Sequence, residues 1–583
     1  ASGALTAPPT TYAETEPTVT SCGNLQAAIT TALNHKVTGN VLLPIQKGLH
    51  CAFTSSPGLT IGANTNTGYL VIRPDPTTSN LPPDGVRIST DWEAEMVTFS
   101  GNVFGSDLRL LYLENNPSRI YLLGIIFENE VPTPATSTEV KAITGATAAT
   151  PIVYISVGHP FIDGDVLQIR EVGGVTGANV TNCKVQNKAT NTFECKGSVG
   201  TGGYTSGGYA VRTPPLAPKP IYGVYTWVTN FVMDRCIFRY VWPATGASAA
   251  IWLPSQAANR STDVNLINSL AYNLNDWVPV DPDTGARATC CSNSPAEGMI
   301  IIAADRVLIQ NNKLDIPGIS VFDDGGRMTD LTFRRNLNDW SAVWKYSSAA
   351  TNWLVTVRQQ FEAKSCFRCQ IEGNQFLGQW WGGPGGGTGA RSHSIVFSGR
   401  SANDGFGGSY GGEYGFGDLT VTNNLIYSAP GGIVVGNDGN GQWDQKPIRN
   451  VLVRNNLMYG ISRARADAAQ TNWYGQATFL TASGPFENLR LENNTLWDKR
   501  AWASDYNPAI AFSGSARGAY FRVQNNFIGD NHDTLTGIQW SDSGTGILPA
   551  ADTTPHTDAI SSKFLHDTSW TGNIVVPGVT AAG

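Results

Sequence analysis

The sequence has 583 residues, of which only 15% are charged, and a net charge of −7. No basic cluster stands out, so we expect no nucleic-acid partner. No run of about eighteen apolar residues occurs, so we expect no membrane span. The 63 glycines exceed the usual share and indicate many tight turns.

Residues 1–20 are rich in proline and threonine and lack an apolar pattern, which predicts an extended N-terminal arm. Pro8, Pro9 and Pro17 restrict its backbone before any contact forms. Nothing in the arm's own sequence would order it. We therefore predict that the arm packs on a neighbouring copy, so that the protein is its own partner in a homo-oligomer or fibre.

Residues 21–145 begin with an amphipathic segment, 25–33, which predicts a helix. The apolar segment 41–44 predicts a strand, and later strands are expected at 69–73 and 120–127. Cys22 and Cys51 bracket the first apolar segments, so we predict a disulfide between them. Such pairs suit an oxidising compartment, and we predict an exported protein whose signal peptide has been removed.

Residues 146–212 change to short strands separated by Gly and Asn turns, which predicts an inserted small β module. Cys183 and Cys195 lie at hairpin spacing and are predicted to form a second disulfide. The phrase His-Pro-Phe-x-x-Gly-Asp at 159–165 and the segment that starts at Tyr204 resemble a small all-β module inserted in phage tail proteins and in ubiquitin-activating enzymes. This resemblance implies a projecting module and says little about chemistry.

Residues 213–540 repeat the phrase apolar–x–apolar–polar–Asn–Asn, followed by a second short apolar segment. In the four clearest copies the second Asn recurs at intervals of 32, 38 and 32 residues. The period of two predicts strands, the Asn pair a tight bend and the interval a β solenoid. We therefore predict one stack of Asn side chains, bonded from coil to coil. Its members are Asn312, Asn336, Asn374, Asn424, Asn456, Asn494 and Asn526.

Asn-rich bends after short strands at this interval resemble the right-handed parallel β-helix of the pectate-lyase-like superfamily. The resemblance implies an all-β fold: a right-handed parallel β-helix with an N-terminal cap helix, here at 25–33, and the inserted small β domain. The superfamily carries lyases, hydrolases, adhesins and phage spikes, so the resemblance does not specify a function.

Two glycine-rich stretches, 382–387 and 406–416, predict long surface loops between strands, where function often lies. After Trp540 the repeated phrase stops, so we expect a polar C-terminal tail over 541–583.

The best carboxylate cluster is Asp323 and Asp324, with Asp330 nearby. Adjacent carboxylates repel, which raises one pKa and suits a general acid, although a solvated Asp-Asp-Gly-Gly turn is the simpler explanation. Glu362 and Lys364 could face the same groove or form an ordinary exposed ion pair. If the protein is an enzyme, we expect Asp323, Asp324 and Glu362 to be catalytic.

Four tryptophans could stack on sugar rings, because the indole is large, flat and rigid, or could instead cover strand edges. They are Trp380, Trp381, Trp443 and Trp473. Among the other cysteines, Cys236 fits a buried thiol. The pairing of the last four stays open, although export favours disulfides over a zinc site, and we expect no metal site. They are Cys290, Cys291, Cys366 and Cys369.

The catalytic phrases of polygalacturonases and pectate lyases are absent from this sequence. The low charged fraction also weakens repulsion between copies. We therefore favour an extracellular structural protein, a self-assembling fibre or surface subunit that could also bind glycans. The alternative is a polysaccharide lyase or glycoside hydrolase acting in a groove along the β-helix. A lyase would imply bound Ca²⁺; otherwise we expect no cofactor.

Overall fold

The computed structural model describes most residues of the chain, and all structural statements concern these residues. The segments outside the description are 1–2, 54, 102–107, 130–139, 171, 181–182, 214–220, 226, 240–248, 254–259, 273–297, 303, 316–320, 323–327, 340–358, 364–365, 379–392, 399–416, 437–447, 462–478, 484–485, 498–509, 514–518, 532–537, 542–568 and 578–583.

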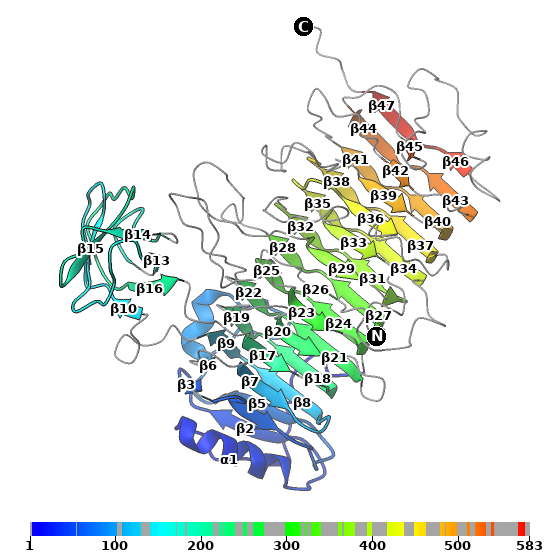
Figure 1. Ribbon diagram of the computed structural model, residues 1–583. Helices are drawn as coiled ribbons and strands as arrows, with labels where there is room; N and C mark the ends of the chain where they lie inside the picture. Colours follow the sequence, from blue (N-terminus) through cyan, green and yellow to red (C-terminus); the bar gives the residue numbers. More distant parts are fainter. Residues whose placement is uncertain are drawn as a thin grey trace.

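Three long parallel sheets, named A, B and C here, wind into a β-helix (Figure 1). They contain 15, 13 and 12 strands, and a coil typically contributes one strand to each sheet in the order A, B, C. The predicted parallel β-helix is therefore confirmed.

Sheet A consists of β1 (Glu14–Thr15), β2 (Val41–Ile45), β5 (Leu70–Pro74), β8 (Ser118–Leu123), β18 (Thr229–Asp234), β21 (Ser261–Ile267), β24 (Ala304–Gln310), β27 (Met328–Arg334), β30 (Cys366–Phe367), β31 (Gln370–Glu372), β34 (Gly417–Thr422), β37 (Ile448–Arg454), β40 (Phe486–Glu492), β43 (Ala519–Gln524) and β46 (Ser569–Thr571). Sheet B consists of β3 (His50–Phe53), β6 (Val97–Gly101), β9 (Ile125–Asn129), β19 (Ile237–Arg239), β22 (Leu270–Tyr272), β25 (Lys313–Asp315), β28 (Leu337–Asp339), β32 (Gln375–Leu377), β35 (Leu425–Tyr427), β38 (Leu457–Tyr459), β41 (Thr495–Trp497), β44 (Phe527–Asn531) and β47 (Ile574–Pro577). Sheet C consists of β4 (Leu59–Ile61), β7 (Leu108–Leu113), β17 (Ile221–Tyr225), β20 (Ala249–Leu253), β23 (Gly298–Ile302), β26 (Val321–Phe322), β29 (Phe361–Ala363), β33 (Ile395–Ser398), β36 (Ile433–Gly436), β39 (Leu480–Ser483), β42 (Ile510–Ser513) and β45 (Ile538–Ser541).

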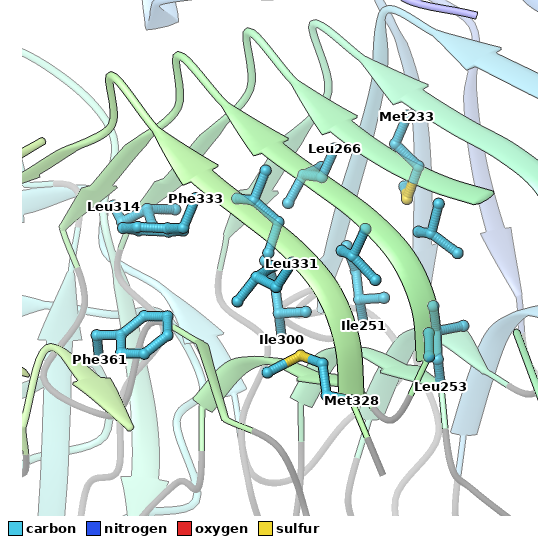
Figure 2. Close-up of a cluster of buried hydrophobic side chains, with 14 of the residues drawn as sticks. Met233, Ile251, Leu253, Leu266, Ile300, Leu314, Met328, Leu331, Phe333 and Phe361 are labelled. Atoms are coloured by element: carbon cyan, nitrogen blue, oxygen red, sulfur yellow. The ribbon is translucent and has the colours of Figure 1, made fainter. Parts of the chain in front are cut away.

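The core fills the space inside the coils. Successive side chains of a strand point to opposite faces, so every strand sends one set of side chains inward. Figure 2 shows this set, with Met233 and Leu331 from sheet A, Leu314 from sheet B, and Ile300 and Phe361 from sheet C. Each coil packs on the next, and the result is one continuous apolar core.

The predicted Asn ladder lies at the two-residue bend between sheets A and B. Asn336 Oδ1 accepts hydrogen bonds from the backbone nitrogen and from Nδ2 of Asn312, both at 3.0 Å. Asn336 Nδ2 donates to Asn374 Oδ1 and to the carbonyl of Ile309. The first bend residue, such as Asn311 at φ 56°, takes left-handed angles. The same bonding continues through the remaining predicted members, so the ladder is confirmed.

A second ladder lies at the other end of the sheet A strands and was not predicted. Its residues all have positive φ, and neighbouring coils carry complementary groups. Arg306 donates to both carboxylate oxygens of Asp263, at 2.8 and 2.7 Å, and Arg368 donates to both of Asp330, at 2.7 Å. Further along, the amide of Asn450 donates to Asp418 at 2.8 Å. These polar pairs connect successive coils on the outside of the solenoid.

The N-terminal end of the solenoid is closed by α1 (Cys22–Leu33), the predicted cap helix. Its Leu25, Ile29 and Leu33 are buried against the first coil. A disulfide between Cys22 and Cys51 joins the helix to β3, as predicted.

The N-terminal arm packs on its own solenoid. Strand β1 pairs in parallel with β2, and the preceding residues run along the outer face of sheet A. Gly3 donates its backbone N–H to Asp263 at 2.6 Å, and Asn265 Nδ2 donates to the carbonyls of Ala4 and Leu5. These contacts order the arm within one chain.

The outer face of sheet A changes from apolar to polar residues near the place where the arm ends. In strand register, one outward column begins with Leu42, Val71, Tyr121 and Val232, which are buried in a cluster with Ala4. The column continues beyond the arm with the more exposed polar residues Thr332, Gln370 and Thr420. The column is therefore mostly apolar where the arm covers it, and Asn265, a polar member of the same column, hydrogen-bonds the arm. Contact between the arm and a neighbouring copy stays a prediction.

Residues 75–96, which include the 3₁₀ helix η1 (Thr90–Glu95), cover the outer face of sheet B in the same coils. Ile88 and Met96 are buried there against Ile126, Ile237 and Leu270. The early coils thus have apolar outer faces that other parts of this chain cover.

The inserted module is an antiparallel seven-stranded sheet with its own core, which includes Tyr154, Phe161 and Phe193. Its strands are β10 (Val140–Ala142), β11 (Gly145–Ala146), β12 (Val153–Ile155), β13 (Val166–Arg170), β14 (Cys183–Gln186), β15 (Thr192–Cys195) and β16 (Tyr209–Thr213). The predicted Cys183–Cys195 disulfide is present. The module begins before residue 146, because β10 pairs with β16, and it interrupts the connection from β9 to β17.

The expectation that the solenoid stops at Trp540 was wrong. Strands β46 and β47 pair with β43 and β44 and add to sheets A and B. Asn573 extends the Asn ladder, since its Oδ1 accepts two hydrogen bonds from Asn526. A single Asn after Gly572 carries this bend, and a search for Asn-Asn pairs misses it.

Candidate functional site

Sheet C is the sheet around which the long connections gather. The bends from sheet A to sheet B are short, and from Asn312 onward the Asn ladder fixes them. Most of the longest connections instead join sheet B to sheet C or sheet C to sheet A, at 340–360, 378–394, 399–416, 460–479 and 542–568. Long loops on a rigid scaffold are frequent carriers of function. The outer face of sheet C is therefore the candidate site.

Glu362 in β29 is the predicted site residue that the structure places on this face. Its neighbours Phe361 and Ala363 point into the core, so its own side chain points outward. It is nevertheless only 5% exposed, and Gln359 Nε2 donates to its Oε2 at 2.5 Å. Glu362 is therefore not exposed, and its predicted ion-pair partner Lys364 lies outside the described residues. A buried carboxylate on an outward position is a candidate for function.

His393 lies one coil further along and was not predicted. Its side chain is 4% exposed, and its Nε2 lies 3.4 Å from the hydroxyl of Thr481 in β39. The ring rests on Gly431, where an added Cβ would approach His393 Cδ2 to 2.6 Å. Glycine at 431 thus creates the room for the imidazole.

Two glutamines, Gln359 and Gln360, directly precede β29. Gln360 is fully buried, and its Nε2 donates to the carbonyls of Leu377 and Asn338, at 3.0 and 3.3 Å. These two bonds fix the residue that directly precedes β29. The side-chain oxygens of Gln359 and Gln360 are buried without a hydrogen-bond partner. Such acceptors indicate a place for a bound water or a ligand hydroxyl.

The structure does not place the other predicted site residues on the outer face of sheet C. Asp323 and Asp324 lie outside the described residues, although they directly follow Phe322, which pairs with Glu362. The four tryptophans Trp380, Trp381, Trp443 and Trp473 also lie outside them. Asp330 belongs to the second ladder on sheet A, where hydrogen bonds from Arg368 lower its pKa. It is therefore not part of this site.

Among the remaining cysteines, the structure shows one further disulfide and one free thiol. Cys366 and Cys369 form a third bond, and Cys236 is a buried free thiol whose pKa burial raises to about 12. Cys290 and Cys291 lie outside the described residues.

In the described chain, no three His, Cys, Asp or Glu side chains gather as ligands, so we derive no step through Ca²⁺. No described helix is long and apolar enough to cross a membrane.

The sequence contains no local signal for His393 and Thr481. His393 lies near the end of the connection 378–394, and Thr481 follows the connection 460–479. Both connections run from sheet B to sheet C and their lengths differ, so counting from the ladder Asn does not locate these residues.

Comparison with known proteins identifies no family for this chain. No family model matches the chain, and no curated protein matches it. Among solved structures, the A-module of the mannuronan C-5 epimerase AlgE4 from Azotobacter vinelandii is 10% identical with a TM-score of 0.32, over 99% of this chain and 94% of that one. The Streptococcus pneumoniae surface protein and adhesin PfbA is 8% identical with a TM-score of 0.37, over 96% and 94%. The tailspike of Pseudomonas phage phi297 is 11% identical with a TM-score of 0.29, over 94% and 72%.

By its sheet topology, the class of protein is a parallel β-helix with an inserted antiparallel module. The low identities and TM-scores of these solved structures support no statement about function.

Proposed function

We propose that this protein is an exported glycan-binding β-helix that holds an extended polysaccharide along the outer face of sheet C. The observation that carries the proposal is that Glu362 and Thr481 lie in one outward column of sheet C, with His393 3.4 Å from Thr481. Three disulfides among the described residues support export, since such bonds persist in oxidising compartments.

The chemistry of these side chains suits a ligand rich in hydroxyl groups. A carboxylate accepts hydrogen bonds, while an imidazole and a threonine hydroxyl can each donate and accept. Gln359, whose amide nitrogen donates to Glu362 and whose side-chain oxygen has no hydrogen-bond partner among the described residues, extends this set. A long, straight row of parallel strands also offers equivalent positions at steps of about 4.8 Å, which suits a linear polymer better than a compact ligand.

The test is binding to a panel of neutral and acidic polysaccharides, measured by affinity electrophoresis and calorimetry. Glu362→Gln and Thr481→Val preserve shape and are expected to weaken binding at least tenfold. The matched control is Gln370→Ala, an exposed residue on sheet A. The proposal fails if no polysaccharide binds, or if both sheet C variants bind as the wild type does.

A second candidate is a hydrolase or lyase on the same face. It is favoured by the register of β26 with β29, because Asp323 directly follows the strand neighbour of Glu362. Glycoside hydrolases use two carboxylates that are about 5–9.5 Å apart. Release of new sugar ends by the wild type, abolished in both Glu362→Gln and Asp323→Asn, would establish it. Binding without any cleavage would reject it.

A third candidate keeps the structural role predicted from the sequence, a self-assembling fibre or surface subunit. It is favoured by an apolar stripe on the outer face of sheet B in the later coils. Tyr427, Leu457, Trp497 and Ile574 there are 43%, 42%, 38% and 58% exposed. The arm's contacts within its own chain remove one of the reasons for preferring assembly, and we therefore rank it below glycan binding.

A further inference from the structure

A guanidinium group is stacked on two tyrosines at the N-terminal end of the sheet C face. The Arg109 guanidinium carbon lies 4.1 Å from the ring centroid of Tyr225 and 5.3 Å from that of Tyr112. The two rings are themselves stacked, with centroids 6.2 Å apart and planes at 20°. Tyr112 and Tyr225 come from neighbouring coils and are half-buried.

Both backbone hydrogen-bonding groups of Arg109 are bonded to segment 56–58. Its N–H donates to Ser56 Oγ at 3.3 Å, and its carbonyl accepts from the N–H of Gly58 at 2.8 Å. Residue 58 must be glycine for this approach, because a Cβ there would lie 2.7 Å from the ring of Phe53. The guanidinium is therefore held in place before any ligand arrives.

This guanidinium has no carboxylate partner in the described chain. Arg235, Arg239, Arg306 and Arg368, by contrast, each form an ion pair with an acidic side chain. Stacking occupies one face of the guanidinium and leaves its N–H donors in the plane available, in the geometry that carboxylate and sulfate oxygens prefer. The Tyr112 hydroxyl also makes no hydrogen bond within the described residues, and it can donate to the same ligand.

The group lies on the same face as Glu362. The strand registers connect Tyr225, through β20, β23 and β26, to Glu362 in one outward column. Four coil steps of about 4.8 Å separate the two residues by about 19 Å. An extended oligosaccharide can span this length and contact both ends.

We propose that Arg109, Tyr112 and Tyr225 form a subsite for an anionic group, a carboxylate or a sulfate ester, of a glycan bound along sheet C. This inference rests on the proposed function and adds the chemical class of the ligand. The net charge of −7 repels an acidic polymer as a whole, so a preorganised cation on this face determines where such a polymer can bind. Binding is also expected to weaken as salt screens the contact.

The experiment compares three probes of equal length: a uronic acid oligosaccharide, a sulfated neutral oligosaccharide and its unsulfated parent. Calorimetry is performed on the full chain as wild type, Arg109→Ala, Arg109→Lys and the control Arg522→Ala, an exposed arginine on sheet A. We expect Arg109→Ala to weaken an anionic probe at least tenfold and to reduce its salt dependence. Arg109→Lys should lie between Arg109→Ala and the wild type, because lysine keeps the charge without the planar stack.

The three probes show which anionic group binds, and they distinguish failure of the subsite from failure of glycan binding. Stronger binding of the uronic acid probe identifies a carboxylate ligand, and stronger binding of the sulfated probe identifies a sulfate. If the wild type binds the unsulfated parent as tightly as both anionic probes, the subsite is overturned while glycan binding stands. Equal loss in Arg109→Ala and Arg522→Ala overturns the subsite as well. If no probe binds, both proposals fail. A thermal melt of Arg109→Ala checks that the variant is folded.

Discussion

Asn424 Oδ1 accepts two hydrogen bonds from Asn374, at 2.9 Å from the backbone nitrogen and 3.0 Å from Nδ2. Asn424 Nδ2 also donates to Asn456 Oδ1 and to the carbonyl of Ile371. The substitution Asn424→Ala removes all four bonds and leaves buried groups unpaired. We expect a loss of about 1–3 kcal/mol in the free energy of unfolding, measured by urea denaturation.

The control for this prediction is Gln370→Ala, which is exposed on sheet A and should change stability by less than about 0.5 kcal/mol. Equal effects of the two substitutions would mean that the ladder is not a source of stability.

The ladder was predictable because the same short phrase recurs along the chain. The second ladder has an equally regular signal that was overlooked: its residues lie six positions before each ladder Asn, as Arg306 does before Asn312. The position of the arm was not predictable in this way. Its proline-rich sequence shows that it is extended, but its binding surface depends on which residues of distant strands, such as Val71 and Val232, point outward.

The candidate site could be predicted only in part, for a related reason. Glu362 was selected from the sequence as one carboxylate near a possible groove. Its burial depends on the arrangement of side chains from other coils, which no local pattern encodes. The stacking of Arg109 on Tyr225 joins residues more than a hundred positions apart, across the inserted module, and only the register of β7 with β17 reveals it.

The second ladder makes stability depend on pH in the acid range. Hydrogen bonds from Arg306 lower the pKa of Asp263, and those from Arg368 lower the pKa of Asp330. The stabilisation is complete above the unfolded pKa, about 3.9, and is lost as pH falls through the lower folded pKa. The double variant Asp263→Asn/Asp330→Asn should therefore flatten the decline in melting temperature below about pH 4.

Asp91→Asn, an acidic residue outside the ladder, is the matched control and should retain the wild-type decline. If the melting temperature of the double variant falls with pH as that of this control does, the second ladder is not the source of the pH dependence.

The disulfide between Cys22 and Cys51 should contribute about 3–4 kcal/mol, because it closes a loop of about thirty residues in the unfolded chain. We expect the double variant Cys22→Ser/Cys51→Ser to lose this amount in urea denaturation. Mass mapping of the native, unreduced protein should also find both cysteines unlabelled by alkylating reagents. Cys236 should react only after unfolding, since it is buried and its pKa is raised to about 12. Labelling of Cys22 in the native state would contradict both the bond and the proposed export.

Deletion of residues 1–20 should expose the apolar column of Val71, Tyr121 and Val232. We expect a lower melting temperature and increased binding of a hydrophobic fluorescent dye. A synthetic peptide of residues 1–20, added to the truncated protein, should reverse both effects. Size-exclusion chromatography with light scattering then separates the two roles of the arm. An unchanged association state after deletion would leave only its contact within the chain.

The stripe on sheet B provides the last prediction, which concerns assembly. Strand register places Tyr427, Tyr459 and Trp497 in one outward column and Leu457 in the column beside it. The Tyr427 and Tyr459 rings are stacked with centroids 5.4 Å apart, so each ring has one face occupied by the other. Earlier coils of the same sheet have apolar residues that segment 75–96 covers.

If the later stripe is covered by a second copy, Leu457→Lys should shift the protein toward monomer without changing its melting temperature by more than a few degrees. Light scattering over a range of concentrations measures this shift, and Gln375→Lys, an exposed polar position on the same sheet, is the matched control. A wild-type protein that is monomeric at every concentration would reject assembly through this face and leave the sheet C site as the remaining basis for function.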